Sequence, residues 1–184
     1  ANPFAALAEG RILQVIKRTT TAGEMIATHT DITALKMAEL RLLNVIESAQ
    51  LCTWEWDVET GEQRVNERWA RILGYELQEL EPVTYQLWRS LVHPEDLPGV
   101  EALLENWGAD DELKEIEYRM RHKTGRWVWV LDRSRILRRG PDGTAQQMAG
   151  IEIEIDDRKA REAALLAAKL DLEGALAERR LAEQ

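Results

Sequence analysis

Three stretches of strand-like sequence, separated by two turn signals, constrain the fold of this chain more than any other feature. Apolar and polar residues alternate over 116–120 and over 151–155, with the period of two that a half-buried strand requires. Between them, residues 127–131 read Trp-Val-Trp-Val-Leu. Lys123–Gly125 and Pro141–Gly143 supply turn chemistry, because glycine tolerates positive φ and proline fixes its own φ. This run therefore predicts three consecutive antiparallel strands.

Two further strands and a set of short helices are predicted before this meander. Cys52, Trp54 and Trp56 alternate with Thr53 and Glu55, which is typical of a strand with one buried face. In chain order we expect strands over 51–58 and 63–66 joined by a turn, a helix from Glu67 that ends at Gly74, two short helical pieces between Leu77 and Trp88, and a longer helix after the His93–Asp96 turn.

Residues 10–33 have the pattern of a hairpin that lacks a domain. Apolar residues stand on both sides of a turn near Thr19–Gly23. Two strands alone are marginally stable in water, so this segment needs another element to pair with. We interpret residues 1–33 as the C-terminal remnant of an upstream domain.

A helix is predicted over residues 34–49, because Asp31 and Thr33 are residue types that cap helices. Its apolar positions recur every three or four residues, which suits pairing with a partner helix. These positions are Leu35, Ala38, Leu42, Val45 and Ala49. Leu43 and Ile46 widen the apolar face, so packing against its own domain is an alternative of equal weight.

Residues 156–184 predict another helix, rich in Ala, Leu, Glu, Lys and Arg, with Asp156 as its capping residue. Its leucines do not follow a single heptad register. The segment 30–39 aligns with 153–162, since in both a strand pattern runs directly into a helix. The same strand-to-helix unit therefore occurs twice in the chain.

Composition narrows the classes of partner. The 184 residues include 33 acidic and 24 basic side chains, and the net charge of −9 argues against binding to nucleic acid or anionic lipid. No apolar run reaches the ~20 residues of a membrane span, and no signal peptide opens the sequence. Cys52 is the only cysteine, which excludes an internal disulfide and suits a reducing compartment. We expect a cytoplasmic segment without membrane contact, although the parent protein could carry an anchor elsewhere.

The order of these elements resembles a PAS domain with its C-terminal PAC portion, in particular the Trp-rich subgroup of bacterial PAS sensors. The motifs that carry the resemblance are Trp54–Asp57, Arg68–Tyr75, Leu91–Asp96, Glu117–Arg119, Thr124–Gly125, Trp129 and Ile155–Lys159. In the family the closing motif is usually Asp-Ile-Thr, as at Asp31–Thr33, whereas the second copy here reads Glu154–Asp156. Residues 1–33 then resemble the tail of a preceding PAS domain.

The resemblance implies an α+β fold with a five-stranded antiparallel sheet, short helices on one face, and flanking N-terminal and C-terminal signalling helices. It divides the chain into an upstream PAS remnant (1–33), a linker helix (34–50), the PAS domain (51–155) and a coiled-coil-type helix (156–184). It also implies a non-enzymatic sensor or relay module of a bacterial signal-transduction protein, with a histidine kinase or a diguanylate cyclase as the output domain.

In such a module the signal would pass from the sheet into the exit helix at Glu154 and Asp156. Asp31 and Thr33 occupy the equivalent positions at the upstream junction. The alternative function is a ligand-free dimerisation spacer between tandem modules.

A homodimer is a separate prediction, which rests on the two flanking helices. Its contacts would be formed by the helix that carries Leu35, Leu42 and Val45, and by the C-terminal helix.

The tryptophans are the candidates for a ligand pocket, because pockets are largely apolar with few polar groups. Indoles also fill cores, where the N–H group seeks a partner, and core filling is the favoured interpretation. The candidate residues for pocket or core are Trp54, Trp56, Trp69, Trp88, Met120 and Trp129. Trp127 and Trp129 share one strand face, so both point into the core or both point outward toward a flanking helix.

No cofactor is expected, although an unidentified small apolar ligand is compatible with a tryptophan-lined pocket. The long helix over 100–107 contains no histidine, which argues against haem. Cys52 lies on the first strand, outside the Asn-Cys-Arg-Phe context of flavin photosensors with this fold. This position argues against a covalent flavin and for a buried, inert thiol.

No metal-ligand spacing and no catalytic constellation is visible among the motifs. His93 lies before a proline in a turn, and we expect it to bond the backbone. Glu95 and Asp96 suit a helix N-terminus, and one of them is expected to pair with Arg119.

Overall fold

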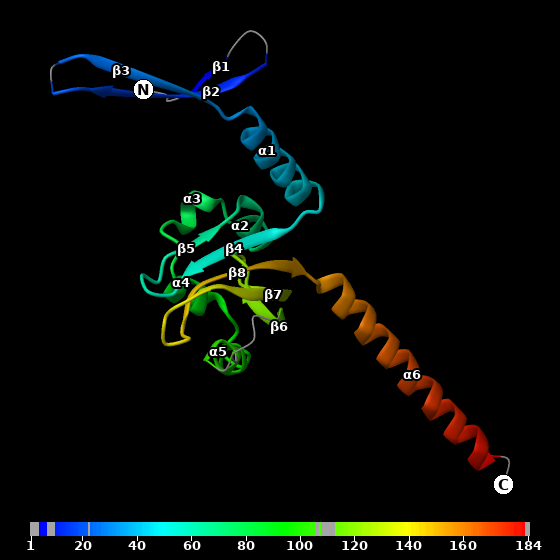
Figure 1. The fold of residues 1–184 in the computed structure, drawn as a ribbon. Helices are drawn as coiled ribbons and strands as arrows, with labels where there is room; N and C mark the ends of the chain where they lie inside the picture. The colour runs from blue at the N-terminus through cyan, green and yellow to red at the C-terminus, as the bar shows by residue number, and fades with distance from the viewer. Residues whose placement is uncertain (1–3, 7–9, 22, 106, 108–112, 183–184) are drawn as a thin grey trace. The chain divides into compact units, whose positions relative to one another are not determined.

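The structure is a computed structural model, in which the chain divides between Gln50 and Leu51 into two compact units (Figure 1). Each unit contains its own antiparallel sheet. No helix among the described residues is long and apolar enough to cross a membrane. The described residues are 4–6, 10–21, 23–105, 107 and 113–182.

The first unit is a three-stranded sheet followed by a helix. Its elements are β1 (Phe4–Ala6), β2 (Ile12–Thr19), β3 (Met25–Asp31) and α1 (Thr33–Ser48), with the strands in the order β1-β2-β3. The predicted hairpin is present as β2 and β3, and the predicted helix as α1. The additional strand β1, which pairs with the start of β2, was not predicted. No residue of α1 is buried.

The second unit is built on a five-stranded antiparallel sheet, as predicted. Its strands are β4 (Cys52–Asp57), β5 (Gln63–Val65), β6 (Lys114–Arg121), β7 (Trp127–Arg139) and β8 (Ala145–Glu154), in the order β5-β4-β8-β7-β6. The predicted three-strand meander is confirmed as β6, β7 and β8. Because β8 lies between β4 and β7, the strand that leads into the C-terminal helix occupies the middle of the sheet.

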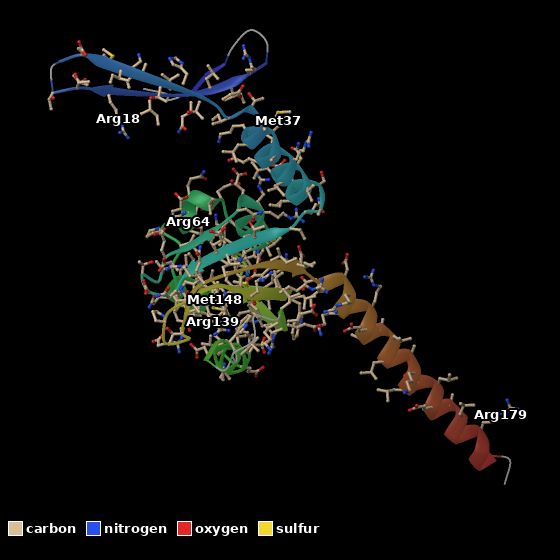
Figure 2. The ribbon with its side chains drawn as sticks, viewed as in Figure 1. Arg18, Met37, Arg64, Arg139, Met148 and Arg179 are labelled. Atoms are coloured by element: carbon tan, nitrogen blue, oxygen red, sulfur yellow. The ribbon has the colours of Figure 1, made fainter. Side chains whose placement is uncertain are left out.

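Four short helices pack on one face of this sheet. They are α2 (Glu67–Ile72), α3 (Leu77–Leu80), α4 (Tyr85–Leu91) and α5 (Leu97–Glu105). The Asn66 side chain caps α2 by accepting a hydrogen bond from the amide of Trp69, and Gly74, with φ of 78°, follows its end. One buried cluster joins all four helices to the sheet. Figure 2 shows side chains gathered most densely around this sheet, with Met148 among them.

The central strand β7 presents two different faces. Val128 and Val130 are fully buried against the helices, and Ile136 continues that inner face. Trp127 and Trp129 alternate with the valines and therefore lie on the outer face. Of the two predicted outcomes for this tryptophan pair, the outward one is present.

The helix α6 (Asp156–Ala182) begins directly after β8. The prediction that Asp156 caps this helix is wrong, since Asp156 is its first residue and its carboxylate bonds to β7. Beyond the junction α6 exposes a series of leucines, with Leu165 73% exposed. Figure 2 shows Arg179 near the far end of this helix.

Candidate functional site

A cavity of about 40 Å³ lies in the second unit, between the sheet and its helices. One water molecule needs roughly 10–15 Å³ of such space. The cavity therefore has room for a molecule of only a few non-hydrogen atoms. This is far below the ~300–1,000 Å³ typical of pockets for drug-sized ligands. Its aromatic lining consists of Trp54, Trp56, Trp69, Tyr85, Trp88 and Tyr118.

The aromatic side chains are arranged in contact with one another. Trp56 stacks on Tyr85 with ring centroids 5.0 Å apart and planes 11° from parallel, and Tyr85 lies 5.4 Å from Trp88. The Trp88 indole donates a hydrogen bond of 3.2 Å to the Tyr118 hydroxyl, and the rings meet edge to face. Such pairs stabilise a core beyond simple burial of area, so these contacts stabilise the walls of the cavity.

Two buried acidic side chains and a serine supply the polar part of the cavity. Asp132 and Glu152 occupy directly opposite positions on β7 and β8, and they are 5% and 1% exposed. Asp132 accepts hydrogen bonds of 2.6 Å from the Trp54 indole and from the Ser134 hydroxyl. Glu152 Oε1 accepts a hydrogen bond of 2.7 Å from the Tyr118 hydroxyl. Two carboxyl groups thus share one desolvated space.

This environment shifts the pKa of both acids upward. Loss of hydration raises the pKa of Glu152, and the charge of Asp132 raises it further, while the hydrogen bond from the Tyr118 hydroxyl and the nearby Trp69 indole act in the opposite direction. Burial likewise raises the pKa of Asp132, against the hydrogen bonds from Ser134 and Trp54. The pair therefore retains protons at a pH where exposed carboxyl groups have lost them.

The residues that were predicted to line a pocket lie in three different environments. Trp54, Trp56, Trp69 and Trp88 line the cavity. Met120 is fully buried in the adjoining core cluster, and Trp129 lies on the opposite face of the sheet.

The acidic pair and Ser134 were not predicted from the sequence. The pattern of β7 contained a signal for them. Every second residue from 128 to 136 lies on the same buried face of the strand, and two of these five residues are polar. Polar residues at inward positions of a strand predict a buried polar site, since burying them without partners is costly.

The junction between the sheet and α6 is the second feature of the site. Asp156 Oδ1 accepts a hydrogen bond of 2.8 Å from the amide of Trp129, and its other oxygen lies 3.1 Å from Arg126. Glu117 on β6 pairs with Arg158 and Lys159 of α6, both at 2.5 Å. The first turn of α6 is therefore attached to two strands of the sheet.

The outward-facing Trp129 lies at the centre of this junction. The ammonium group of Lys159 is 4.7 Å from its ring centroid and the guanidinium of Arg119 is 5.2 Å away. A cation over an indole face is attracted by the ring quadrupole. These contacts explain why the indole lies outward against the exit helix instead of in the core.

The junction of the first unit has the same bonding pattern. Thr33 Oγ1 accepts a hydrogen bond of 2.8 Å from the amide of Ile12, and the Ile32 amide donates to the Ile12 carbonyl at 2.9 Å. At the second junction, the Ile155 amide donates to the Trp129 carbonyl at 2.8 Å. Thr33 and Asp156 therefore perform the same bonding role, as their alignment in the sequence repeat implies.

The two acidic positions that precede these residues differ. Asp31 accepts hydrogen bonds from the amide and the hydroxyl of Thr33, at 2.9 and 2.6 Å. Glu154 pairs through its backbone with Val130, and its side chain is exposed. Of the four residues expected at the junctions, Asp31, Thr33 and Asp156 thus hold hydrogen bonds through their side chains.

The expected ion pair next to α5 is present. Asp96 contacts the Arg119 guanidinium at 2.7 and 2.8 Å and also accepts from the Arg119 amide, while the exposed Glu95 reaches the same guanidinium at 2.9 Å. The hydrogen bonds from Arg119 lower the pKa of Asp96. His93 accepts from the Glu95 amide at 3.2 Å, which is the predicted backbone bond. This cluster fixes the turn before α5 to β6.

The remaining reactive side chains do not form a further site in the described part of the chain. Cys52 is buried, as expected, and burial raises the pKa of its thiol to about 12. Among the described residues, no group of three His, Cys, Asp or Glu side chains is placed to hold a metal ion.

Residues 63–152 match the family model described as the PAS fold. Together with the five-stranded sheet and its helices, this match shows that this part of the chain has the PAS fold. A sensory box histidine kinase/response regulator from Burkholderia thailandensis has a similar structure. It is 28% identical at a TM-score of 0.59, over 72% of this chain and 98% of that chain.

Two further similarities agree with this assignment. The N-terminal domain of a diguanylate cyclase with PAS/PAC sensor from Marinobacter aquaeolei has a TM-score of 0.51 at 20% identity, over 59% of this chain and 98% of that one, which shows the fold alone. The sensor protein FixL of Bradyrhizobium diazoefficiens is 26% identical over 120 residues, or 65% of this chain. The chain spans only 16% and 23% of the lengths of the two curated relatives it matches.

Proposed function

We propose that the second unit is a non-enzymatic sensory and relay module of a cytoplasmic segment of a bacterial signal-transduction protein, which passes a change in its sheet into α6. The observation that carries the proposal is the Asp156 carboxylate, which attaches the first residue of α6 to the amide of Trp129. Trp129 and the cavity residue Asp132 belong to the same strand, three positions apart. We therefore expect a displacement of β7 at the cavity to move the first turn of α6.

The mechanism is a shift between two arrangements of sheet and helix. A guest in the cavity, or a signal from an upstream module, would favour one arrangement by contacting it better than the other. The contacts that change are the bond from Asp156 to β7 and the ion pairs of Arg158 and Lys159 with Glu117. Several charged side chains meet at this junction, so a small movement of α6 would change several interactions at once.

A histidine kinase is the output domain we favour, with a diguanylate cyclase as the other outcome. Support comes from the likeness to a sensory box histidine kinase/response regulator at 28% identity. The first unit would be the tail of a preceding PAS domain, because the bonds at Thr33 and Ile32 repeat those at Asp156 and Ile155. The parent protein would then contain PAS modules in tandem.

We propose no histidine-bound haem and no covalent flavin in this cavity. The residues that line it include neither a histidine nor the single cysteine. The volume of about 40 Å³ would also have to grow severalfold to admit either ring system.

The relay is tested by substituting Asp156→Ala in the full-length parent protein, which removes the oxygen that accepts from the Trp129 amide. We expect the output activity to change by at least about fivefold, in the range typical of coupling between sites. The matched control is Asp157→Ala, since Asp157 is the adjacent, exposed acid at the same helix terminus. Autophosphorylation or cyclase assays provide the measurement. Equal output from the parent and the Asp156→Ala variant would refute the relay.

Dimerisation is a separate prediction. Leu35, Leu42 and Val45 of α1 are 65%, 66% and 63% exposed, and α6 exposes its leucines as well. Exposed leucines at helical spacing favour pairing with a second copy. We expect light scattering of the whole chain to give the mass of a dimer, and replacement of Leu35 and Leu42 by Gln to shift it toward the monomer. A monomeric mass at high protein concentration would contradict this prediction.

A ligand-free dimerisation spacer is the second candidate function. The observation in its favour is the small cavity, whose stacked aromatic walls already fill most of the space between sheet and helices. A spacer would respond to mutations in α1 and α6 but not to changes at Glu152 or Asp132. The output assay therefore discriminates the two functions when it is applied to cavity variants.

A further inference from the structure

Among the described residues that line the cavity, two are acids and none is basic. Asp132 and Glu152 face it from adjacent strands. A buried carboxylate without a positive partner is costly, because the interior cannot replace the hydration it has lost. In the free protein the retained protons lower this cost, and a cation in the same space would take over their role.

One oxygen of this pair has no partner. Both oxygens of Asp132 accept a hydrogen bond, and Oε1 of Glu152 accepts one from Tyr118. Glu152 Oε2 is fully buried and has no hydrogen-bond partner among the described residues. Buried polar atoms in native proteins nearly always have a partner. Once Glu152 has released its proton, the position beside Oε2 is therefore suited to a guest that donates hydrogen bonds.

The walls of the cavity favour a positively charged guest. Indole and phenol rings attract cations over their faces, and cages of such rings are used to bind ammonium groups. Trp54, Trp56 and Trp88 belong to this lining together with two tyrosines. An ammonium group carries several N–H donors and no acceptor, which complements acids that already use their other oxygens.

We propose that this cavity binds a small ammonium-type cation, either ammonium itself or a short primary amine, which enters as Glu152 releases its proton and lies between the resulting carboxylate and the aromatic side chains. The volume of about 40 Å³ limits the guest to a few non-hydrogen atoms. Carboxylate oxygens also suit divalent metals, but two acids are fewer than the protein ligands that calcium prefers. This inference deepens the proposed sensory function, for which it names the class of ligand.

The test is a fluorescence titration of the whole chain with ammonium chloride and methylammonium chloride, against sodium chloride at equal ionic strength. All seven tryptophans belong to the second unit, and four of them line the cavity. We expect a saturable change in tryptophan emission and an increase of a few degrees in Tm with the ammonium salts, and neither with sodium.

The variant Glu152→Gln keeps the shape of the side chain and removes its charge. We expect it to weaken the apparent affinity at least tenfold. Asp132→Asn is a second variant, in case Glu152→Gln impairs folding. Glu55→Gln, an exposed acid on β4, is the matched control and should titrate like the parent.

Identical responses to ammonium and sodium would overturn the inference, as expected of a cavity that holds only water. An unchanged affinity in both cavity variants would also overturn it. Because binding is measured without any output domain, either result leaves the relay at Asp156 to be judged by its own experiment.

Discussion

Raising the pH from about 5 to about 8 is expected to lower the free energy of unfolding of the second unit. Burial and the neighbouring charge of Asp132 raise the pKa of Glu152 to about 8 in the folded state, whereas the unfolded chain keeps the ordinary value near 4.5. Between these two values the unfolded state loses a proton that the folded state retains. Stability therefore falls as pH rises, by up to about 1.4 kcal/mol per pH unit for one proton.

Other groups that face Glu152 titrate mainly outside this window. Asp132 adds to the fall at its lower end, because its pKa is raised to about 6. Burial raises the pKa values of Tyr118 and Cys52 further above this window. The lowered pKa of Asp96 acts only at more acidic pH, where its contribution to stability is lost. Glu152 is therefore the main cause of the slope.

The measurement is urea unfolding followed by tryptophan fluorescence across this pH range, for the parent, Glu152→Gln and the exposed-acid control Glu55→Gln. Glu152→Gln should flatten most of the slope, since a neutral amide has no proton to retain. Glu55→Gln should keep the slope of the parent. Parallel slopes in the parent and in Glu152→Gln would show that the acid titrates in the folded state as it does in the unfolded chain.

Gly150→Ala is expected to destabilise the second unit by roughly 1–3 kcal/mol or more, the usual cost of forcing an extra carbon into a packed core. A Cβ atom at this position would lie 2.6 Å from the carbonyl oxygen of Arg133 and 2.8 Å from the ring of Trp54. The backbone oxygen cannot move without disturbing the pairing of β7 with β8. The Trp54 ring would have to shift as well, which weakens its 2.6 Å bond to Asp132.

Gly99→Ala provides the matched control for this substitution. A Cβ atom at Gly99 meets nothing within 4 Å, and the residue lies in α5. Alanine is the better helix former by about 1 kcal/mol, so this variant should be as stable as the parent or more stable. Urea unfolding at fixed pH gives both values. If the two alanine variants were equally stable, the close packing around Gly150 would be disproved.

Much of the second unit was predictable because its sequence carries strong local signals. The alternation of residues 116–120 and 151–155, and the turns at Gly125 and Gly143, identified the three-strand meander. Alternation at Cys52 and Trp54 identified β4 in the same way. Even one tertiary contact, the pairing of Asp96 with Arg119, followed from the position of an acid beside a helix start and a basic residue on the neighbouring strand.

The candidate site was predicted less completely, because the middle strand has apolar residues on both faces. Trp127, Val128, Trp129 and Val130 do not reveal which set faces the helices, and the larger side chains were the natural choice for the pocket. The smaller valines fill the core instead, since the cations Arg119 and Lys159 hold Trp129 on the outer face. The acids were overlooked for the same reason, because their inward position depends on this parity.

The strand β1 was missed for a different reason. It is three residues long and its sequence, Phe-Ala-Ala, contains no alternation. Its place in the sheet comes from pairing with β2, which is a tertiary effect that local pattern cannot supply.

The repeated junction has a consequence for the geometry of any linker built from these helices. Since Thr33 and Asp156 bond their strands in equivalent ways, α1 and α6 each begin at a fixed rotational phase relative to their own sheet. Successive residues of a helix are rotated by about 100°, so the direction in which a distant side chain points is set by the number of residues that separate it from the junction. Linker length in such a chain therefore encodes angle as well as distance, and a module seven residues further along meets nearly the same orientation.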